Sequence, residues 1–252
     1  MTNEDIIAAL ELPSVCLLDL RVPKTLLIEH GAATAADKRR INESIGELRW
    51  RAALKPTTVG VPEFRDEERE YLEIAILSGT LRGDASPGRL AELIHRAVPY
   101  PVFLIIQRGD TVELSLAHKR WSQAKSAAVV LDSGVSVGAL SGEIPASIAQ
   151  PFLAALALSR QPKSDMFALY QGWIGACMAL RAARITGVFV ETASPDQAAA
   201  REQALADCER LEVRMARLRA AAEAERQIAR QVEWNLELQQ ARAEYAAVRA
   251  RL

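Results

Sequence analysis

The feature that most constrains this chain is an uninterrupted helix-forming segment at its carboxyl end. After Pro195 the sequence runs 57 residues, from Asp196 to Leu252, without a glycine or a proline. Alanine, arginine, glutamate, glutamine and leucine fill most of it, and these residues favour helix at nearly every position. A continuous helix of that length would extend roughly 85 Å, at about 1.5 Å per residue. We therefore expect a rod that begins at the Ser194-Pro195 cap and meets another helix or another protein.

Two apolar stripes follow this predicted helix, and their phases differ. Extending the first stripe forward reaches Glu225, and extending the second stripe backward reaches Gln231 and Gln227, which are all polar. We therefore expect a stutter, a kink or a change of partner surface between Ala222 and Trp234. Packing must hold the helix, because acidic residues with an arginine four positions ahead are missing. Packing within the chain, including a helical hairpin, stays open, but we favour a coiled coil with a second copy or another protein. The predicted partner-binding residues are Leu211, Met215, Leu218, Trp234, Leu238, Tyr245, Val248 and Leu252.

The first 142 residues mix strand and helix patterns. Apolar and alternating runs predict strands, and the clearest hairpin surrounds Arg108-Gly109-Asp110. Spacings of three and four predict one amphipathic helix over residues 35–54 and another over 87–97. We therefore predict an α+β fold with a small mixed sheet, an antiparallel hairpin and packed helices, followed by a helical region and a long C-terminal helix or coiled coil. The expected divisions are a head at 1–142, a helical region at 143–193 and the long helix at 194–252. Predicted strands cover residues 15–20, 71–81, 102–107, 111–116, 127–131 and 135–140.

Bulk properties favour a soluble cytoplasmic protein. The net charge of −1 gives no support to a strongly basic nucleic-acid-binding protein. Cys16, Cys177 and Cys208 are isolated thiols without metal-ligand spacing, which is typical of a reducing compartment. The acidic N-terminus is unlike a secretory signal, and residues 166–190 are interrupted by arginines, so we expect no membrane span. No cofactor motif is present, and we expect none to be bound.

No catalytic set stands out, and we interpret the chain as a non-enzyme. His95 and His118 are expected to be surface or packing residues rather than general bases. A basic and aromatic cluster is the alternative, a nucleic-acid-binding patch in which a tryptophan stacks among cations. Its residues are His118, Lys119, Arg120, Trp121 and Lys125. A second alternative, a metal-dependent nuclease, would draw on Glu70, Glu73, Asp84 and Lys119, although no motif joins them.

A series of motifs occurs in a fixed order at residues 21–24, 48–56, 94–101, 117–120 and 231–238. Together these motifs make the chain resemble a bacterial protein family, domain-of-unknown-function family 4391. The order is more specific than any single motif, and it reaches from one end of the chain to the other. The chain departs from the usual pattern in its high alanine and arginine content and in Trp234, where members often have leucine.

The resemblance implies a biological setting but no catalytic residues. Members look like single-domain proteins encoded near helicases and DNA methyltransferases, in restriction-like or phage-defence clusters. We therefore expect a non-catalytic accessory subunit of a DNA-directed antiviral defence complex. Its C-terminal helix would associate with a helicase or methyltransferase subunit, with a second copy of the chain, or with both, and contact with DNA remains possible.

Overall fold

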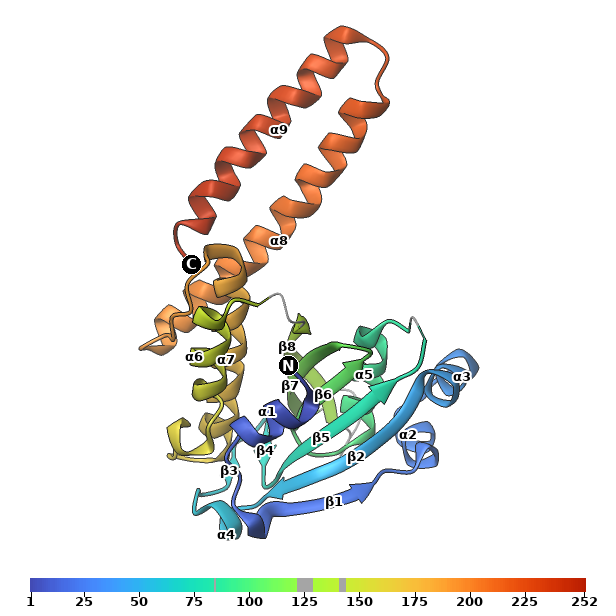
Figure 1. Cartoon of the computed structure of the whole chain (residues 1–252), viewed down its shortest axis with the longest axis vertical. Helices are drawn as coiled ribbons and strands as arrows, with labels where there is room; N and C mark the ends of the chain where they lie inside the picture. Colours follow the sequence, from blue (N-terminus) through green and yellow to red (C-terminus); the bar gives the residue numbers. More distant parts are fainter. Residues whose placement is uncertain (84, 122–128, 141–143) are drawn as a thin grey trace. The chain divides into compact units, whose positions relative to one another are not determined.

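The chain forms two compact units, Met1–Cys177 and Met178–Leu252. The computed structural model describes every residue except 84, 122–128 and 141–143 (Figure 1). The boundary falls inside helix α7 (Met166–Thr186), so the helical region predicted at 143–193 is divided between the two units. None of the helices in the described residues has both the length and the apolar character needed to cross a membrane.

The first unit is built on a mixed six-stranded sheet with the strand order β1-β2-β5-β6-β7-β8. Neighbouring strands are antiparallel except β5 and β6, which run parallel and are connected through helix α5 (Pro87–Ala97). The predicted hairpin is confirmed at β6 and β7, where Gly109 adopts a φ of 57°. A further two-stranded ribbon joins β3 and β4. The strands are β1 (Leu17–Arg21), β2 (Ile45–Leu54), β3 (Phe64–Arg65), β4 (Glu70–Tyr71), β5 (Ile74–Leu81), β6 (Val102–Arg108), β7 (Thr111–Trp121) and β8 (Val129–Leu140).

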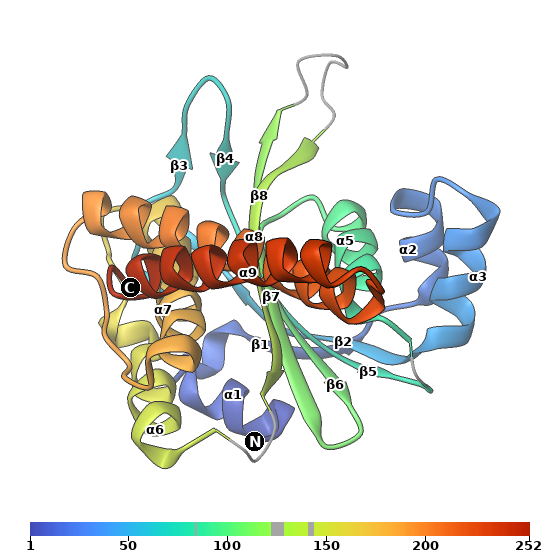
Figure 2. The same ribbon diagram turned by 90° about the horizontal axis from the view of Figure 1, so that it is seen from above.

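Helices cover both faces of this sheet, which confirms the predicted α+β class (Figure 2). On one face, α2 (Lys24–His30), α3 (Ala35–Ser44) and α5 enclose a core with alternate residues of β6 such as Val102 and Leu104. On the other face the Phe103 ring meets Trp173 of α7, with 5.4 Å between ring centroids. This face also carries α1 (Asn3–Ala9) and α6 (Ala146–Ala155), and a short helix, α4 (Pro56–Val59), follows β2.

The helix predicted over residues 35–54 is wrong in its second half. Helix α3 ends at Ser44, and Ile45 begins the ten-residue strand β2. Buried side chains at Ile45, Leu48 and Ala52 produced the helical spacing in the sequence. Residues 45–54 form a strand rather than a helix because β2 lies between β1 and β5 and forms backbone hydrogen bonds with both.

The second unit confirms a long C-terminal helical region, but the prediction of one continuous rod is wrong. Helix α8 (Pro195–Ala224) and helix α9 (Ile228–Arg249) are separated by residues 225–227, where Glu225 and Gln227 have extended backbone angles. The Ser194 side chain accepts a hydrogen bond from the Gln197 amide, as the predicted cap requires. The two helices fold into an antiparallel hairpin, since residues near the start of α8 pack with residues near the end of α9.

Candidate functional site

The predicted partner-binding residues lie between α8 and α9. Cys208 and Leu211 pack with Val248 at one end of the hairpin, while Leu218 packs with Leu238 towards the other. The Arg214 guanidinium pairs with the Glu244 carboxylate at 3.1 Å across the same junction. We call this junction the seam. The remaining members of the set, Met215, Trp234, Tyr245 and Leu252, are partly buried against it. The seam therefore accounts for both stripes within one chain, and it is not free to receive a second chain while the hairpin is closed.

A different face of α9 carries apolar side chains in solvent. Ile228, Val232 and Leu236 are 79%, 51% and 60% exposed, and they follow one another at four-residue spacing. At about 100° per residue this spacing places them on one side of the helix, opposite the seam residue Ala241. We call these three residues the outer stripe. They are not among the residues that pack in the seam of the described chain.

The predicted basic and aromatic patch is not assembled on one surface. Successive residues of a strand point to opposite faces, so the neighbours His118 and Lys119 turn away from each other, and both are buried. Arg120 reaches solvent but pairs with the Asp132 carboxylate at 3.1 Å. Trp121 is 37% exposed, and Lys125 lies outside the described residues. Of the described members, only Arg120 and Trp121 can meet a nucleic acid in this conformation.

His118 belongs to a closed hydrogen-bonded chain. Its Nδ1 accepts from the Tyr71 hydroxyl at 2.5 Å, and its Nε2 donates to the Gln171 side-chain oxygen at 2.6 Å. The Phe167 ring stacks on the imidazole, with 5.0 Å between centroids. Burial lowers the pKa of His118 and raises the pKa of Tyr71. Both groups therefore stay neutral near pH 7, and both ring nitrogens of His118 are used in packing.

The residues considered for a nuclease are also dispersed. Glu73 pairs with Lys55 at 3.5 Å, and Glu70 pairs with Arg65 at 3.1 Å. Lys119 is buried beneath α5, where its ammonium donates to the Val98 carbonyl. Asp84 lies outside the described residues. Within those residues no three His, Cys, Asp or Glu side chains gather closely enough to hold a metal ion.

The edge strand β1 has an unusual surface for the edge of a sheet. It pairs with β2 on one side and has no strand partner on its outer side in the described part of the molecule (Figure 1). Every residue of β1 is exposed, including Leu17 at 51% and Leu20 at 60%. Val15 precedes the strand, and Leu26 of the adjacent α2 is also exposed. Soluble proteins usually protect such edges with charges or a covering element, so this apolar edge is a candidate contact surface.

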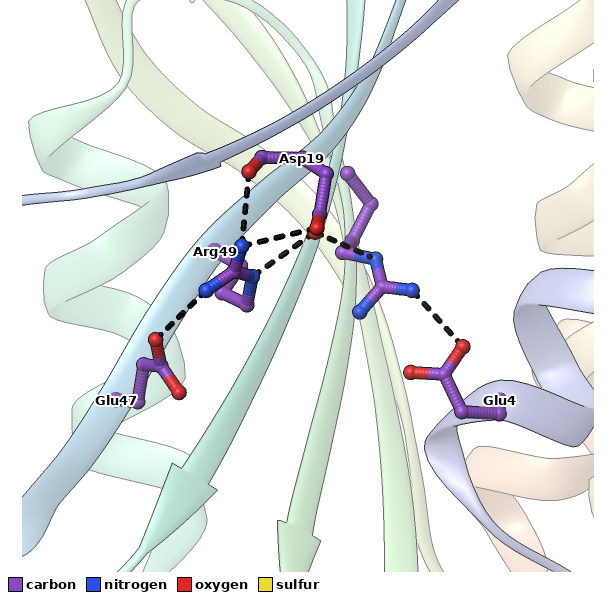
Figure 3. A network of polar contacts seen from close by, with 5 residues as sticks. Glu4, Asp19, Glu47 and Arg49 are labelled. Atoms are coloured by element: carbon purple, nitrogen blue, oxygen red, sulfur yellow. Dashed lines mark hydrogen bonds and ion pairs between the residues drawn. The ribbon is translucent and has the colours of Figure 1, made fainter. Parts of the chain in front are cut away.

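An ionic network fixes the shape of this edge (Figure 3). Asp19 has a φ of 50°, and the pairing of β1 with β2 shifts register between Leu17 and Leu20. Both Asp19 carboxylate oxygens accept from the Arg49 guanidinium at 2.9 Å, and this guanidinium also binds the Asp19 carbonyl. The pKa of the Asp19 carboxyl is lowered mainly by these hydrogen bonds. The Arg49 side chain thus holds the bulge at Asp19 against β2, in addition to the backbone hydrogen bonds between the two strands.

The same network includes ion pairs with two further carboxylates near this edge. Arg49 also pairs with Glu47 at 2.9 Å, while Arg51 pairs with Glu4 at 2.8 Å and approaches Asp19 at 3.4 Å. All three carboxylates are thus paired, but three carboxylates against two guanidiniums leave the network with one negative charge in excess (Figure 3). This excess offsets further positive charge nearby only in part.

Such positive charge lies at the end of β1. Arg21 ends the strand and Lys24 begins α2, and both line a pocket of about 330 Å³. The other lining residues are Val22, Pro23, Gly46, Leu48 and Glu47, whose carboxylate is paired with Arg49. The Lys24 ammonium donates to the carbonyls of Asn42 and Ile45, which carry no net charge. Burial and the charges of Arg82 and Arg21 lower the pKa of Lys24. No ion pair joins Arg21, Lys24 or Arg82 to a carboxylate among the described residues. We call these three residues the cation cluster.

Sequence reasoning did not select this edge as a site. The only signal was the motif at residues 21–24, which entered through the family resemblance and carried no assigned role. The exposure of Leu20 and the pairing of Asp19 with Arg49 depend on long-range contacts. Neither can be deduced from the local sequence.

These features define the molecule as an α+β chain with a helical hairpin and an exposed apolar surface on each unit. A family model described as "Domain of unknown function (DUF4391)" matches residues 10–244. The match covers nearly the whole chain, so the protein belongs to this family, as the resemblance indicated. Neither a curated protein nor a solved structure matches the chain.

Proposed function

We propose that this protein is a non-catalytic accessory subunit of a bacterial DNA-directed antiviral defence complex, and that it associates through its C-terminal hairpin. The outer stripe of α9 is the observation that carries this proposal. Ile228, Val232 and Leu236 are more than half exposed, and they line one side of a helix whose opposite side is already packed. The placement in a defence complex rests on the resemblance and on no contact in the molecule.

The spacing of the outer stripe suits one helix of a partner subunit. Three anchors at four-residue intervals form a narrow apolar line, and an amphipathic helix can lay its own apolar face along such a line. Full burial of an aliphatic side chain contributes about 1.5–3 kcal/mol, and partial exposure in the free protein reduces this figure. The three side chains together would contribute a few kcal/mol, which suits a regulated subunit contact. The expected partner is a helicase or methyltransferase subunit.

Co-purification of the full chain with the products of its neighbouring genes tests this proposal. The double variant V232D/L236D places two carboxylates in the outer stripe and should reduce the bound partner at least tenfold. The matched control is A216D/A220D, which adds the same two charges at exposed positions of α8. Unchanged circular dichroism at 222 nm would show that both hairpins remain folded.

Two outcomes would contradict the proposal. In one, V232D/L236D retains the partner as well as the parent chain does. In the other, no neighbouring product binds the parent chain, and its mass in solution is that of a monomer. A dimer that V232D/L236D dissociates would instead assign the outer stripe to a second copy of the chain.

A further inference from the structure

The edge of β1 combines two properties that a solvated edge rarely has together. Its side chains are apolar on both faces, and the outer hydrogen-bonding groups of its backbone have no strand partner in the described chain. Exposed edges with these properties pair readily with another strand unless something covers them. A short extended segment that joined β1 would cover Leu20 and satisfy the free backbone groups together.

The bulge at Asp19 leaves part of the edge regular. Beyond it, Leu20 pairs with Trp50, Arg21 pairs with Arg49, and the Val22 amide donates to the Leu48 carbonyl at 2.8 Å. Because Arg49 holds the Asp19 carboxylate at both oxygens, the residues after the bulge keep a fixed position against β2. The edge from Leu20 to Val22 is therefore preorganised, which reduces the entropy lost on binding.

The charge at this end of the edge determines which residue types a bound segment would carry. The cation cluster lies where β1 passes into α2, and its three positive charges exceed the single negative charge left over in the network of Arg49 and Arg51. An incoming carboxylate would meet guanidinium and ammonium groups without displacing an existing ion pair. An incoming lysine or arginine would be repelled.

We propose that the outer edge of β1 binds an extended acidic segment of another protein, with its apolar side chains on Leu20 and Leu26 and its carboxylates at the cation cluster. This surface is on the first unit and is distinct from the outer stripe of α9. The pocket beside Arg21 and Lys24 receives one acidic side chain of the segment. The segment adds a short strand to the sheet at its β1 edge.

A second copy of this chain fits the same edge poorly. Its β1 would bring a second Arg21 and a second Lys24 to the interface. Its Asp19 carboxylate is already held by Arg49 and Arg51 and cannot neutralise the cation cluster. An acidic segment from a different protein satisfies both the charge and the apolar surface.

Selection from a random octapeptide library displayed on phage tests the proposal with the full-length protein. We expect the enriched peptides to have apolar residues at every second position, with threonine or valine between them. We also expect two or more carboxylates at one end. Fluorescence anisotropy then gives the affinity of an enriched peptide for the parent chain and for R21E/R82E. Because the two substitutions remove two attractive charges and add repulsion at both positions, we expect at least tenfold weaker binding.

Two further variants make the result specific to the edge. L20D places a negative charge on the apolar surface of β1 and should also weaken binding at least tenfold. The matched control R217E reverses an exposed arginine of α8 and should leave the affinity unchanged. Circular dichroism spectra like that of the parent chain would show that each variant is folded, as expected for exposed side chains.

Several results would overturn the proposal. These are a selection that enriches no peptide, enriched peptides without acidic residues, and acidic peptides that bind R21E/R82E as tightly as the parent chain. A parent chain that is dimeric in solution, and that becomes monomeric in L20D, would assign the edge to a second copy instead.

Discussion

Replacement of the buried Lys119 by methionine should stabilise the first unit at neutral pH. Lys119 is 3% exposed, and its ammonium donates to the Val98 carbonyl at the end of α5. His95 packs nearby with its Nε2 2.9 Å from the Ser115 hydroxyl, and its charge, if present, would repel the ammonium. No carboxylate pairs with Lys119 among the described residues. Burial lowers the pKa of this amine to about 7.

The size of the effect follows from the difference between the folded and unfolded proteins. The unfolded chain holds the Lys119 proton up to its ordinary pKa of 10.5, whereas the folded chain releases it near pH 7. At about 1.4 kcal/mol per pH unit, the penalty on the charged amine is roughly 5 kcal/mol. The hydrogen bond to Val98, worth about 1–2 kcal/mol, is lost in the variant. We therefore expect Lys119→Met to gain about 3 kcal/mol at pH 7.

The sign of the pH dependence identifies the cause. Between pH 7 and 10.5 the Lys119 amine binds more protons in the unfolded chain than in the folded chain, so its contribution to the free energy of unfolding rises with pH. The contribution of Lys119 is least favourable below pH 7 and is restored as the pH approaches 10.5. Burial, with a smaller effect from the charge of Lys119, lowers the pKa of His95 to about 3, so His95 affects stability only at acidic pH. The gain in Lys119→Met should thus shrink to nearly zero by pH 10.

Urea denaturation at pH 7, 8, 9 and 10, followed by tryptophan fluorescence, measures this difference. Comparison of the variant with the parent protein at each pH cancels the titration of all other groups. The exposed Lys163→Met variant is the matched control and should show no pH-dependent difference. The reasoning is refuted if Lys119→Met is less stable than the parent protein at pH 7, or if the difference is the same at pH 7 and pH 10.

Two further predictions concern packing. Leu218 is 1% exposed in the seam, so Leu218→Ala should destabilise the hairpin by about 2–4 kcal/mol, measured by thermal melting at 222 nm, whereas Val213→Ala, at a position 72% exposed, should have little effect. A Cβ at Gly31 would lie 2.5 Å from the Leu93 carbonyl oxygen, so Gly31→Ala should lower the unfolding free energy by more than about 1 kcal/mol. Gly88→Ala, where a Cβ meets nothing within 4 Å, is its control, and equal stability of the two variants would contradict the close approach.

Local signals were sufficient where a few neighbouring residues decide the structure. Pro87 and the periodic leucines predicted α5, and Gly109 predicted the β6–β7 hairpin. The mismatch in phase between the stripes indicated a change after Ala222, and the chain reverses there. The sequence did not select a reversal over a kink, because residues 225–227 contain neither glycine nor proline and only the packing of the two stripes favours it.

The candidate sites were harder to predict, because they depend on which side chains the folded chain leaves exposed. The apolar run at residues 15–20 predicted a strand, but nothing local indicated that Leu20 would lie at a free edge. The cluster around Trp121 looked basic in the sequence. In the folded chain the alternation of β7 buries His118 and Lys119 on opposite faces. Burial of charged side chains is a long-range outcome that composition does not reveal.

The seam of the hairpin gives this unit an adjustable length. Apolar residues of α8 advance by four and three residues, and so do those from Trp234 in α9 to Leu252 just beyond it. The residues of α8 are Ala204, Cys208, Leu211, Met215, Leu218 and Ala222. Insertion or deletion of seven residues in each arm would preserve this register and shift the turn by about 10 Å, at about 1.5 Å per residue. Homologues that differed by matched heptads would therefore keep the same packing in the seam and place the turn at a different distance from the start of the hairpin.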